Sequence, residues 1–286
     1  MKTLAIFFAL GAWGADLKVA AVQFRSSADL EDNRARIVST IAKLAADKVD
    51  VAVFPECALT GYIEQAIRTD SAEAIDAAEK SIRAVCRDRR IAAIVGSVHK
   101  INGKTFNTAI VIDKQGELVE RYGKVMLAGE KWATPGNHIA YFELNGIPST
   151  VIICHDERYP ELARLPAIQG ARVLYYISHE SGMNYESKLA PYRAQLMARA
   201  VENQMFIVAA NAPGNLKDGS GSHGQSRIVL DDGNITKEAG IYGDEILVEN
   251  LAVKPRTLDR PLQGLMGQWW RRGIDSMMEN RNRKLE

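Results

Sequence analysis

The sequence predicts a layered α/β domain, with sheet inside and helices outside. Segments with strand character alternate with segments with helix character along most of its 286 residues. The strand segments are short and apolar, as expected of strands buried on both faces. No repeat, low-complexity tract or linker marks a boundary before about residue 253. We therefore expect one domain over residues 15–253 and a C-terminal extension over residues 254–286.

Two long helices are expected in the first half of the chain. The first covers residues 32–47, where Ile37, Ile41 and Leu44 recur at spacings of four and three. The second covers about residues 71–90, where small and branched apolar residues fall on one face. Strands are expected at residues 17–24, 51–54, 91–98 and 106–112, with a turn at 113–116.

The second half repeats this alternation. Helices are expected at residues 160–169 and 187–203, and strands at 149–153, 172–177, 205–210, 226–230 and 246–252, with a turn at 231–233. The extension that follows carries Trp269, Trp270 and several arginines. Its apolar residues need a surface to pack on, either this domain or a second subunit.

The first fourteen residues have the pattern of a secretory signal peptide. Lys2 gives a positive start, residues 4–13 are nearly all apolar, and Ala12 and Gly14 are small residues at the −3 and −1 positions of a cleavage site. The apolar run is too short to span a bilayer. The alternative is a buried first strand with a ragged start. We expect cleavage after Gly14 and export to the periplasm or outside the cell.

Charge and cysteine count exclude several classes of protein. The chain has 36 basic and 35 acidic residues, interspersed, so its net charge gives no reason to expect a nucleic-acid partner. The chain has three cysteines, Cys57, Cys86 and Cys154, and this number is odd and low for a disulfide framework. In an exported protein at least one thiol then stays free, which a site that needs it would explain. No metal-ligand spacing and no glycine-rich phosphate loop is present, so we expect no cofactor and no metal.

Three segments place a reactive side chain at the end of an apolar strand. These side chains are Glu56, Lys124 and Cys154. In α/β sheets, sites form where strands end. A thiolate can attack a carbonyl carbon, a carboxylate can carry the proton to the leaving amine, and a cation can stabilise the oxyanion. Taken singly, each has an ordinary alternative: a core cysteine, a surface glutamate and a solvated lysine. Only their combination predicts acyl transfer.

The sequence resembles the nitrilase (carbon–nitrogen hydrolase) superfamily over about residues 17–252. Phe54-Pro-Glu-Cys-Ala-Leu-Thr-Gly-Tyr62 is similar to the segment around the family's general base, and Ile153-Cys-His-Asp-Glu-Arg-Tyr-Pro-Glu161 to the nucleophile motif. Further similar segments, in the family's order, are 122–130, 134–137, 198–204, 209–211 and 223–226. The resemblance implies an αββα sandwich whose sheet packs against a partner's, in a homodimer or larger homo-oligomer.

The resemblance also implies the catalytic roles. Cys154 is expected to form a thioester, and Glu56 to act first as general base and then as general acid. Lys124 and the backbone N–H of His155 are expected to hold the oxyanion. Glu130 is expected to orient the substrate and tune the site.

Substrate contacts are predicted around the nucleophile. His155 and Glu157 stand where relatives usually carry other residue types, so His155 either lines the pocket or faces outward and hydrogen-bonds a loop. Arg158 either binds a substrate carboxylate or forms a structural ion pair within the protein. The remaining expected contacts rim the pocket: Tyr62, His179, Glu180 and Asn184.

The predicted function is therefore an exported hydrolase that cleaves a non-peptide C–N bond. Its substrate is expected to be a small linear amide or an N-carbamoyl amine. An amidase is favoured over a nitrilase because the Cys-x-Asp motif followed by Tyr-Pro-Glu resembles the amidase and carbamoylase branches. The alternatives are an inactive binding protein on the same fold and an acyltransferase that uses the same thioester.

Overall fold

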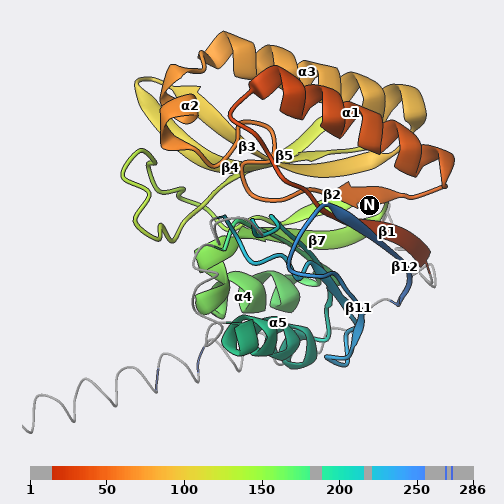
Figure 1. Cartoon of the computed structure of the whole chain (residues 1–286). Helices are drawn as coiled ribbons and strands as arrows, with labels where there is room; N and C mark the ends of the chain where they lie inside the picture. Colours follow the sequence, from red (N-terminus) through yellow and green to blue (C-terminus); the bar gives the residue numbers. More distant parts are fainter. Residues whose placement is uncertain (1–14, 181–188, 216–220, 255–267, 269–271, 273–286) are drawn as a thin grey trace, which may run out of the picture.

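The computed structural model describes residues 15–180, 189–215, 221–254, 268 and 272. They form two six-stranded sheets with helices outside them (Figure 1). The first sheet has the order β12-β1-β2-β3-β4-β5, and the second β11-β10-β9-β8-β7-β6. In the first, the strands are β1 (Ala15–Gln23), β2 (Val51–Val53), β3 (Ala92–Ile101), β4 (Lys104–Ile112), β5 (Leu118–Gly123) and β12 (Glu245–Val253). In the second, they are β6 (Phe142–Leu144), β7 (Ile147–Ile153), β8 (Val173–Ser178), β9 (Phe206–Asn211), β10 (Arg227–Val229) and β11 (Ile235–Glu238).

Alternation along the strands builds three stacked apolar layers. On β1, Val19 and Ala21 face the second sheet, and Ala20 and Val22 face the helices. The other strands follow the same rule, because successive side chains point to opposite faces. One layer therefore lies between the sheets, and one lies on each outer face.

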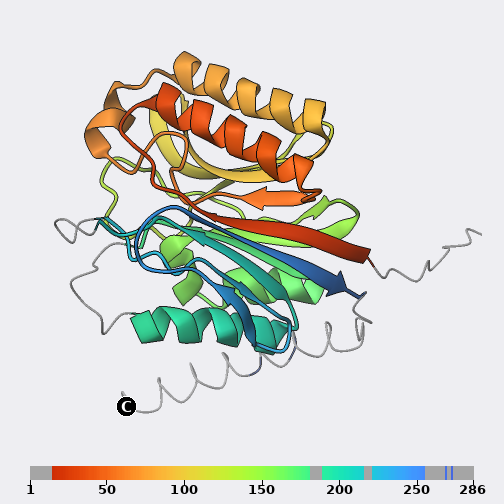
Figure 2. The same ribbon diagram turned by 45° about the vertical axis from the view of Figure 1, so that its right-hand side comes forward.

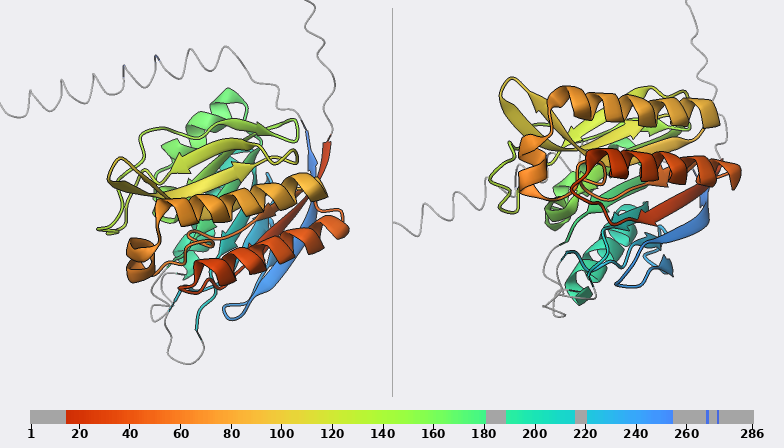
Figure 3. Two further views of the ribbon diagram at one scale, coloured as in Figure 1. Left: turned by 90° about the horizontal axis from the view of Figure 1, so that it is seen from above. Right: turned by 45° about the horizontal axis from the view of Figure 1, so that its top comes forward.

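Four helices cover the outer faces (Figures 1 and 2). On the first sheet lie α1 (Leu30–Ala46) and α3 (Ala72–Arg89), side by side (Figure 3). On the second lie α4 (Glu161–Gln169) and α5 (Leu189–Asn203). This is an αββα sandwich, which confirms the predicted fold class.

Helix boundaries follow from capping side chains. The Asp29 carboxylate accepts hydrogen bonds from the backbone N–H groups of Glu31 and Asp32, which satisfies free donors at the start of α1. Ser71 caps α3 in the same way, through the N–H of Ala74. The two helices were expected at residues 32–47 and about 71–90.

Strand direction decides where the reactive residues meet. β2 runs parallel to β3, and β4 and then β5 pair antiparallel in turn, so β5 is parallel to β2. In the second sheet β7, β8 and β9 are mutually parallel. The carboxyl ends of β2 and β5 therefore lie at one edge of their sheet, and those of β7 and β8 at one edge of theirs.

Two of the predicted segments lie wholly or mostly outside the described residues. They are the signal peptide at residues 1–14 and the C-terminal extension after residue 254. Among the described helices, none is long and apolar enough to cross a bilayer.

Candidate active site

A buried lysine joins two buried carboxylates at the strand ends. Lys124 follows β5, and its Nζ lies 2.8 Å from Oε1 of Glu56, which follows β2. The same Nζ hydrogen-bonds Oε1 of Glu130. All three side chains are almost completely shielded from water. A single cation between two carboxylates compensates charges that would each be costly to bury alone.

Glu56 is held in one orientation by two further donors. Asn107 on β4 donates its side-chain N–H to Oε1 at 2.7 Å. The backbone N–H of His179, just after β8, donates to Oε2 at 2.8 Å. The turn that carries Glu56 passes so close to Gly96 of β3 that a Cβ there would lie 2.6 Å from the Glu56 Cα. Glycine at position 96 is what allows this approach.

Charge coupling fixes the protonation of Lys124 and Glu130. Burial alone would lower the pKa of Lys124, but the adjacent Glu56 carboxylate and the Cys154 and Glu130 side chains raise it instead. Burial alone would raise the pKa of Glu130, but Lys124 beside it and local hydrogen bonds lower it. The lysine is thus a fixed cation, and Glu130 a fixed anion.

Cys154 stands at a sharp turn from strand to helix. It follows β7 and opens the short 3₁₀ helix η1 (Cys154–Arg158) with a left-handed φ of 48°. This conformation is uncommon for a residue other than glycine, and a strained strand-to-helix turn also exposes the nucleophile in the unrelated α/β-hydrolase fold. Cys154 is partly exposed, whereas Cys57 and Cys86 are buried and free.

The Cys154 thiol needs a base. Removal of the sulfur from water raises the thiol's pKa well above its usual value, and the Glu56 carboxylate raises it further, against the opposing charge of Lys124. The resting sulfur is therefore protonated at neutral pH. Both Glu56 and Lys124 lie within electrostatic reach of it.

Asp156 ties the nucleophile turn to the lysine segment. Its buried carboxylate accepts the backbone N–H of Ile153 at 3.0 Å and that of Met126 at 2.8 Å, and the hydroxyl of Tyr122 at 2.8 Å. Burial raises the pKa of Asp156 to about 6. Sequence reasoning assigned this residue no role, although its place two residues after the nucleophile was the available signal.

Aromatic rings form one wall beside Glu130. The Tyr62 ring stacks on the His179 ring at 4.5 Å between centroids, and its edge meets Trp132 at 6.4 Å. The Tyr62 hydroxyl donates to Oε1 of Glu130 at 3.0 Å. Trp132 was not among the residues expected from the sequence.

Arg158 and His155 lie on the exposed side of η1. The Arg158 guanidinium lies 5.8 Å from the centre of the Tyr192 ring and 3.5 Å from its hydroxyl. His155 is partly exposed, and its ring meets the Tyr159 ring edge-on at 5.8 Å. The substrate roles expected of both residues stay predictions.

Glu180 is enclosed by protein donors. Tyr176 donates its hydroxyl to one carboxylate oxygen, and Nε2 of His223 lies 2.5 Å from the other. Both oxygens therefore contact protein side chains, and the residue is almost completely buried. Its expected substrate contact is untested, and Asn184 lies outside the described residues.

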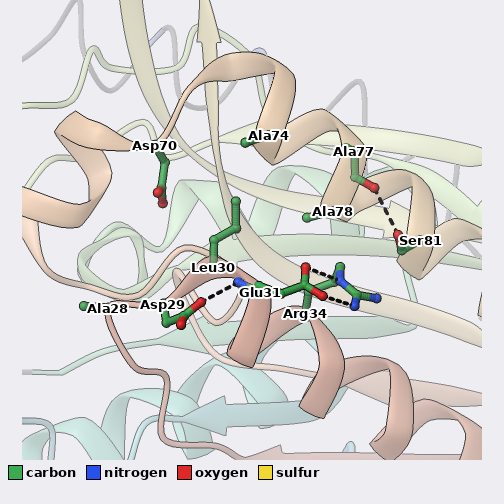
Figure 4. Close-up of a pocket in the computed structure, with 10 residues that line it drawn as sticks. All are labelled: Ala28, Asp29, Leu30, Glu31, Arg34, Asp70, Ala74, Ala77, Ala78 and Ser81. Atoms are coloured by element: carbon green, nitrogen blue, oxygen red, sulfur yellow. Dashed lines mark hydrogen bonds and ion pairs between the residues drawn. The ribbon is translucent and has the colours of Figure 1, made fainter.

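A separate surface groove lies between the N-terminal ends of α1 and α3 (Figure 4). Its floor includes Ala74, Ala77 and Ala78, and the ion pair between Glu31 and Arg34 lies along one side. None of the four expected catalytic residues lines it. Within the described part of the chain, no three His, Cys, Asp or Glu side chains are grouped as metal ligands would be.

A partly exposed cysteine at a strained strand end, beside a buried Glu–Lys–Glu set, defines the class of a cysteine-dependent acyl-transfer enzyme. The family model for carbon–nitrogen hydrolases matches residues 18–255, so the chain belongs to that family and is a C–N hydrolase. The resemblance found in the sequence is confirmed.

Known relatives agree with this assignment. The chain is 31% identical to a "Hydrolase in agr operon" of Staphylococcus aureus, over 77% of this chain and 85% of the relative. It is 31% identical to the 2-oxoglutaramate amidase of Bacillus subtilis, over 67% of this chain and 74% of the relative. Among solved structures, an amidase from Nesterenkonia sp. superposes with a TM-score of 0.77 at 27% identity, covering 91% of this chain and 99% of that one. One Nesterenkonia structure shows acrylamide added at "the active site cysteine".

Proposed function

We propose that this enzyme hydrolyses a small linear amide through a thioester on Cys154. The observation that carries the proposal is the contact of Lys124 with both Glu56 and Glu130, at the strand ends where Cys154, the one partly exposed residue among the described cysteines, is found. Such a set supplies a nucleophile, a proton carrier and an oxyanion donor together.

In the acylation step, Cys154 is the nucleophile, Glu56 carries the proton and Lys124 stabilises the oxyanion. Glu56 accepts the thiol proton as the sulfur attacks the amide carbon, which gives a tetrahedral oxyanion. The Lys124 ammonium and the backbone N–H of His155 stabilise the oxygen. Glu56 then delivers its proton to the leaving nitrogen, the C–N bond breaks, and ammonia or an amine departs.

In deacylation, water gives the proton to Glu56 and the sulfur receives it. Water gives a proton to Glu56 as it attacks the thioester carbon, and the carbon–sulfur bond then breaks. The proton returns from Glu56 to the sulfur, and a carboxylic acid is released. Glu130 holds the Lys124 ammonium in place through both steps.

For the substrate, we propose an amide or N-carbamoyl compound that carries a carboxylate at its far end. Arg158 is exposed, lies within electrostatic reach of Cys154 and has no carboxylate at ion-pair distance among the described residues. A guanidinium so placed can bind a carboxylate through two hydrogen bonds. The Bacillus subtilis relative is named for a substrate of this kind, 2-oxoglutaramate.

The test compares wild type with Cys154→Ala on butyramide, glutaramate and an N-carbamoyl amino acid, with ammonia release as readout. Loss of activity on every substrate is expected, and equal rates would contradict the proposal. Cys86→Ala removes a buried thiol remote from the site and serves as the control. Arg158→Met should raise KM for glutaramate and leave that for butyramide unchanged.

We also propose that the enzyme is a homodimer. An exposed apolar face on and beside the outer helices supports this proposal: Tyr159, Leu165, Met197 and Val201 are 36–53% exposed. Apolar side chains grouped in this way favour burial against a second copy.

Finally, we propose that residues 1–14 direct export and are removed. The sequence pattern supports this proposal: Lys2, an apolar run over residues 4–13, and the small residues Ala12 and Gly14. N-terminal sequencing of protein from a bacterial periplasm or culture medium should read from Ala15. Retention of Met1 on cytoplasmic protein would contradict export.

A further inference from the structure

A second carboxyl lies behind the nucleophile and takes no part in the mechanism above. Glu157 belongs to η1, three residues after Cys154, and its side chain is fully buried. Neither carboxyl oxygen makes a well-directed hydrogen bond with a described residue. The hydroxyl of Tyr176 lies within interaction range of this carboxyl group.

Tyr176 stands between two carboxyl groups. Its hydroxyl donates to Glu180 and so lies between Glu157 and Glu180. Glu180 is also in contact with His223, whose ring stacks on Tyr192 at 5.4 Å. Glu180 thus accepts a hydrogen bond from Tyr176, whereas the Glu157 carboxyl oxygens accept none from a described residue.

None of the nearby arginines hydrogen-bonds the Glu157 carboxyl group, although Nη1 of Arg227 and Nε of Arg199 are buried without a partner among the described residues. From β10, Arg227 donates to the Gln225 carbonyl at 3.0 Å and faces Glu238. From α5, Arg199 donates to the backbone oxygen of Glu157, not to its carboxyl group. Arg158, on the same turn, is exposed and contacts Tyr192.

The remaining neighbour is apolar. α4 packs against η1 and contributes Leu162 and Ala163 to this part of the core. A bare carboxylate in such surroundings is strongly disfavoured, so the carboxyl group keeps its proton. Consistently, burial and then the charge of Glu180 raise the pKa of Glu157 well above its usual value.

We propose that Glu157 is a positioning residue that works as an uncharged carboxylic acid behind Cys154, and that loss of its proton to alkaline solvent slows acylation. The proposal rests on the thioester mechanism above. The charges of Glu180 and Glu157 both act on the Cys154 sulfur. A second anion there opposes the negative charge that develops on the sulfur and the oxyanion.

This role is compatible with a glutamate at position 157. The Glu157 side chain is buried beside η1 and α4, where apolar residues line the core. A neutral carboxylic acid can occupy the same buried space, but it carries a proton that high pH removes. Glu157→Gln keeps the shape and the neutral state and cannot ionise.

The first test needs no turnover. Infrared spectra of wild type at neutral pH should show the carbonyl band of a buried protonated carboxylic acid. That band should be absent from Glu157→Gln, or from Glu157→Leu should the glutamine variant not fold, and present in Glu143→Gln, whose exposed side chain makes it a matched control. A spectrum without the band overturns the inference, whatever the activity of the enzyme.

The second test is the pH dependence of kcat/KM. The kcat/KM of Glu157→Gln divided by that of wild type should rise about tenfold for each pH unit above the ionisation of Glu157. The reason is that wild type loses one proton there and the variant does not. Wild type and Glu143→Gln should keep a constant ratio. A constant ratio for Glu157→Gln, or a folded but inactive Glu157→Gln, overturns the inference. Absence of amide hydrolysis in wild type would instead contradict the proposed function and leave the infrared result standing.

Discussion

At the scale of single residues, the site depends on charges that compensate one another. Lys124 pairs with Glu56 and Glu130 where almost no water reaches. Such a cluster adds little stability when complete, because desolvation offsets the attraction. Its value lies in the protonation states that it fixes: a permanent ammonium ion beside a carboxylate that can accept a proton.

Removal of the cation should therefore be costly. Lys124→Ala leaves two carboxylates buried side by side and should lower the free energy of unfolding by about 3–5 kcal/mol. Urea unfolding at pH 7 measures the loss. Arg68→Ala breaks an exposed pair with Glu64 and should cost about 1 kcal/mol or less. Equal losses for the two variants would show that the cluster is not a buried ionic network.

At the residue scale, motifs in the sequence pointed to residues that lie near one another at the strand ends. The sequence suggested that Glu56, Lys124, Glu130 and Cys154 meet, and the structure brings the first three into contact with the thiol in electrostatic reach. Asn107 was missed. Asn107 is a polar residue in a strand that was predicted from its apolar pattern. It reaches Glu56 because β4 pairs with β3.

At the scale of elements, the turn after β7 does most to arrange the site. Cys154 takes a left-handed conformation, and Asp156 bonds three donors from two segments. The Asp156 carboxylate thus links the turn to the lysine segment.

Asp156→Ala should therefore lower both stability and activity. It leaves two backbone N–H groups and one hydroxyl without an acceptor, at a cost of at least about 2 kcal/mol at pH 7. Tyr122→Phe removes one of these bonds and should cost about 1 kcal/mol. Denaturant unfolding and kcat/KM for both variants test this; a smaller loss for Asp156→Ala than for Tyr122→Phe would contradict it.

The stability that the Asp156 carboxyl group contributes depends on pH. The pKa of Asp156 is raised to about 6 in the folded protein, so the folded state binds the proton more tightly than the unfolded chain. The resulting stability is complete below about pH 4 and is lost as pH rises through about 6. The stability difference between wild type and Asp156→Ala should therefore shrink over this range, and a difference that grows would contradict the assignment.

Long periodic elements were predictable, and short or exposed ones were not. The helix expected over residues 32–47 is Leu30–Ala46, because its apolar spacing and the Asp29 cap agree. The strands β6 and β11 were missed. β6 has only three residues, and β11 is largely exposed, so neither carries an apolar pattern, and each exists because a neighbouring strand pairs with it.

At the scale of the whole molecule, four apolar side chains on or beside the outer helices are exposed: Tyr159, Leu165, Met197 and Val201. In the proposed dimer a second copy covers them, so Val201→Glu should yield monomers, because a charge in an apolar interface is costly. Sedimentation equilibrium measures the mass. Val119→Glu places the same charge at an exposed apolar position on β5 and should leave the dimer intact. A monomeric wild type, or a dimeric Val201→Glu, would contradict this interface.

The architecture also brings residues from distant parts of the chain to one place. Two sheets stack so that the ends of β2 and β5 meet the ends of β7 and β8, and the reactive groups follow these strands. In the proposed mechanism, the sulfur at this meeting point carries an acyl group. Acid-quenched mass spectrometry during turnover of an amide tests for that acyl group. We predict an added acyl mass on the peptide that contains Cys154, removable by hydroxylamine and absent from Cys57 and Cys86. Steady ammonia release with Cys154 unmodified and the acyl group on another residue would contradict this mechanism.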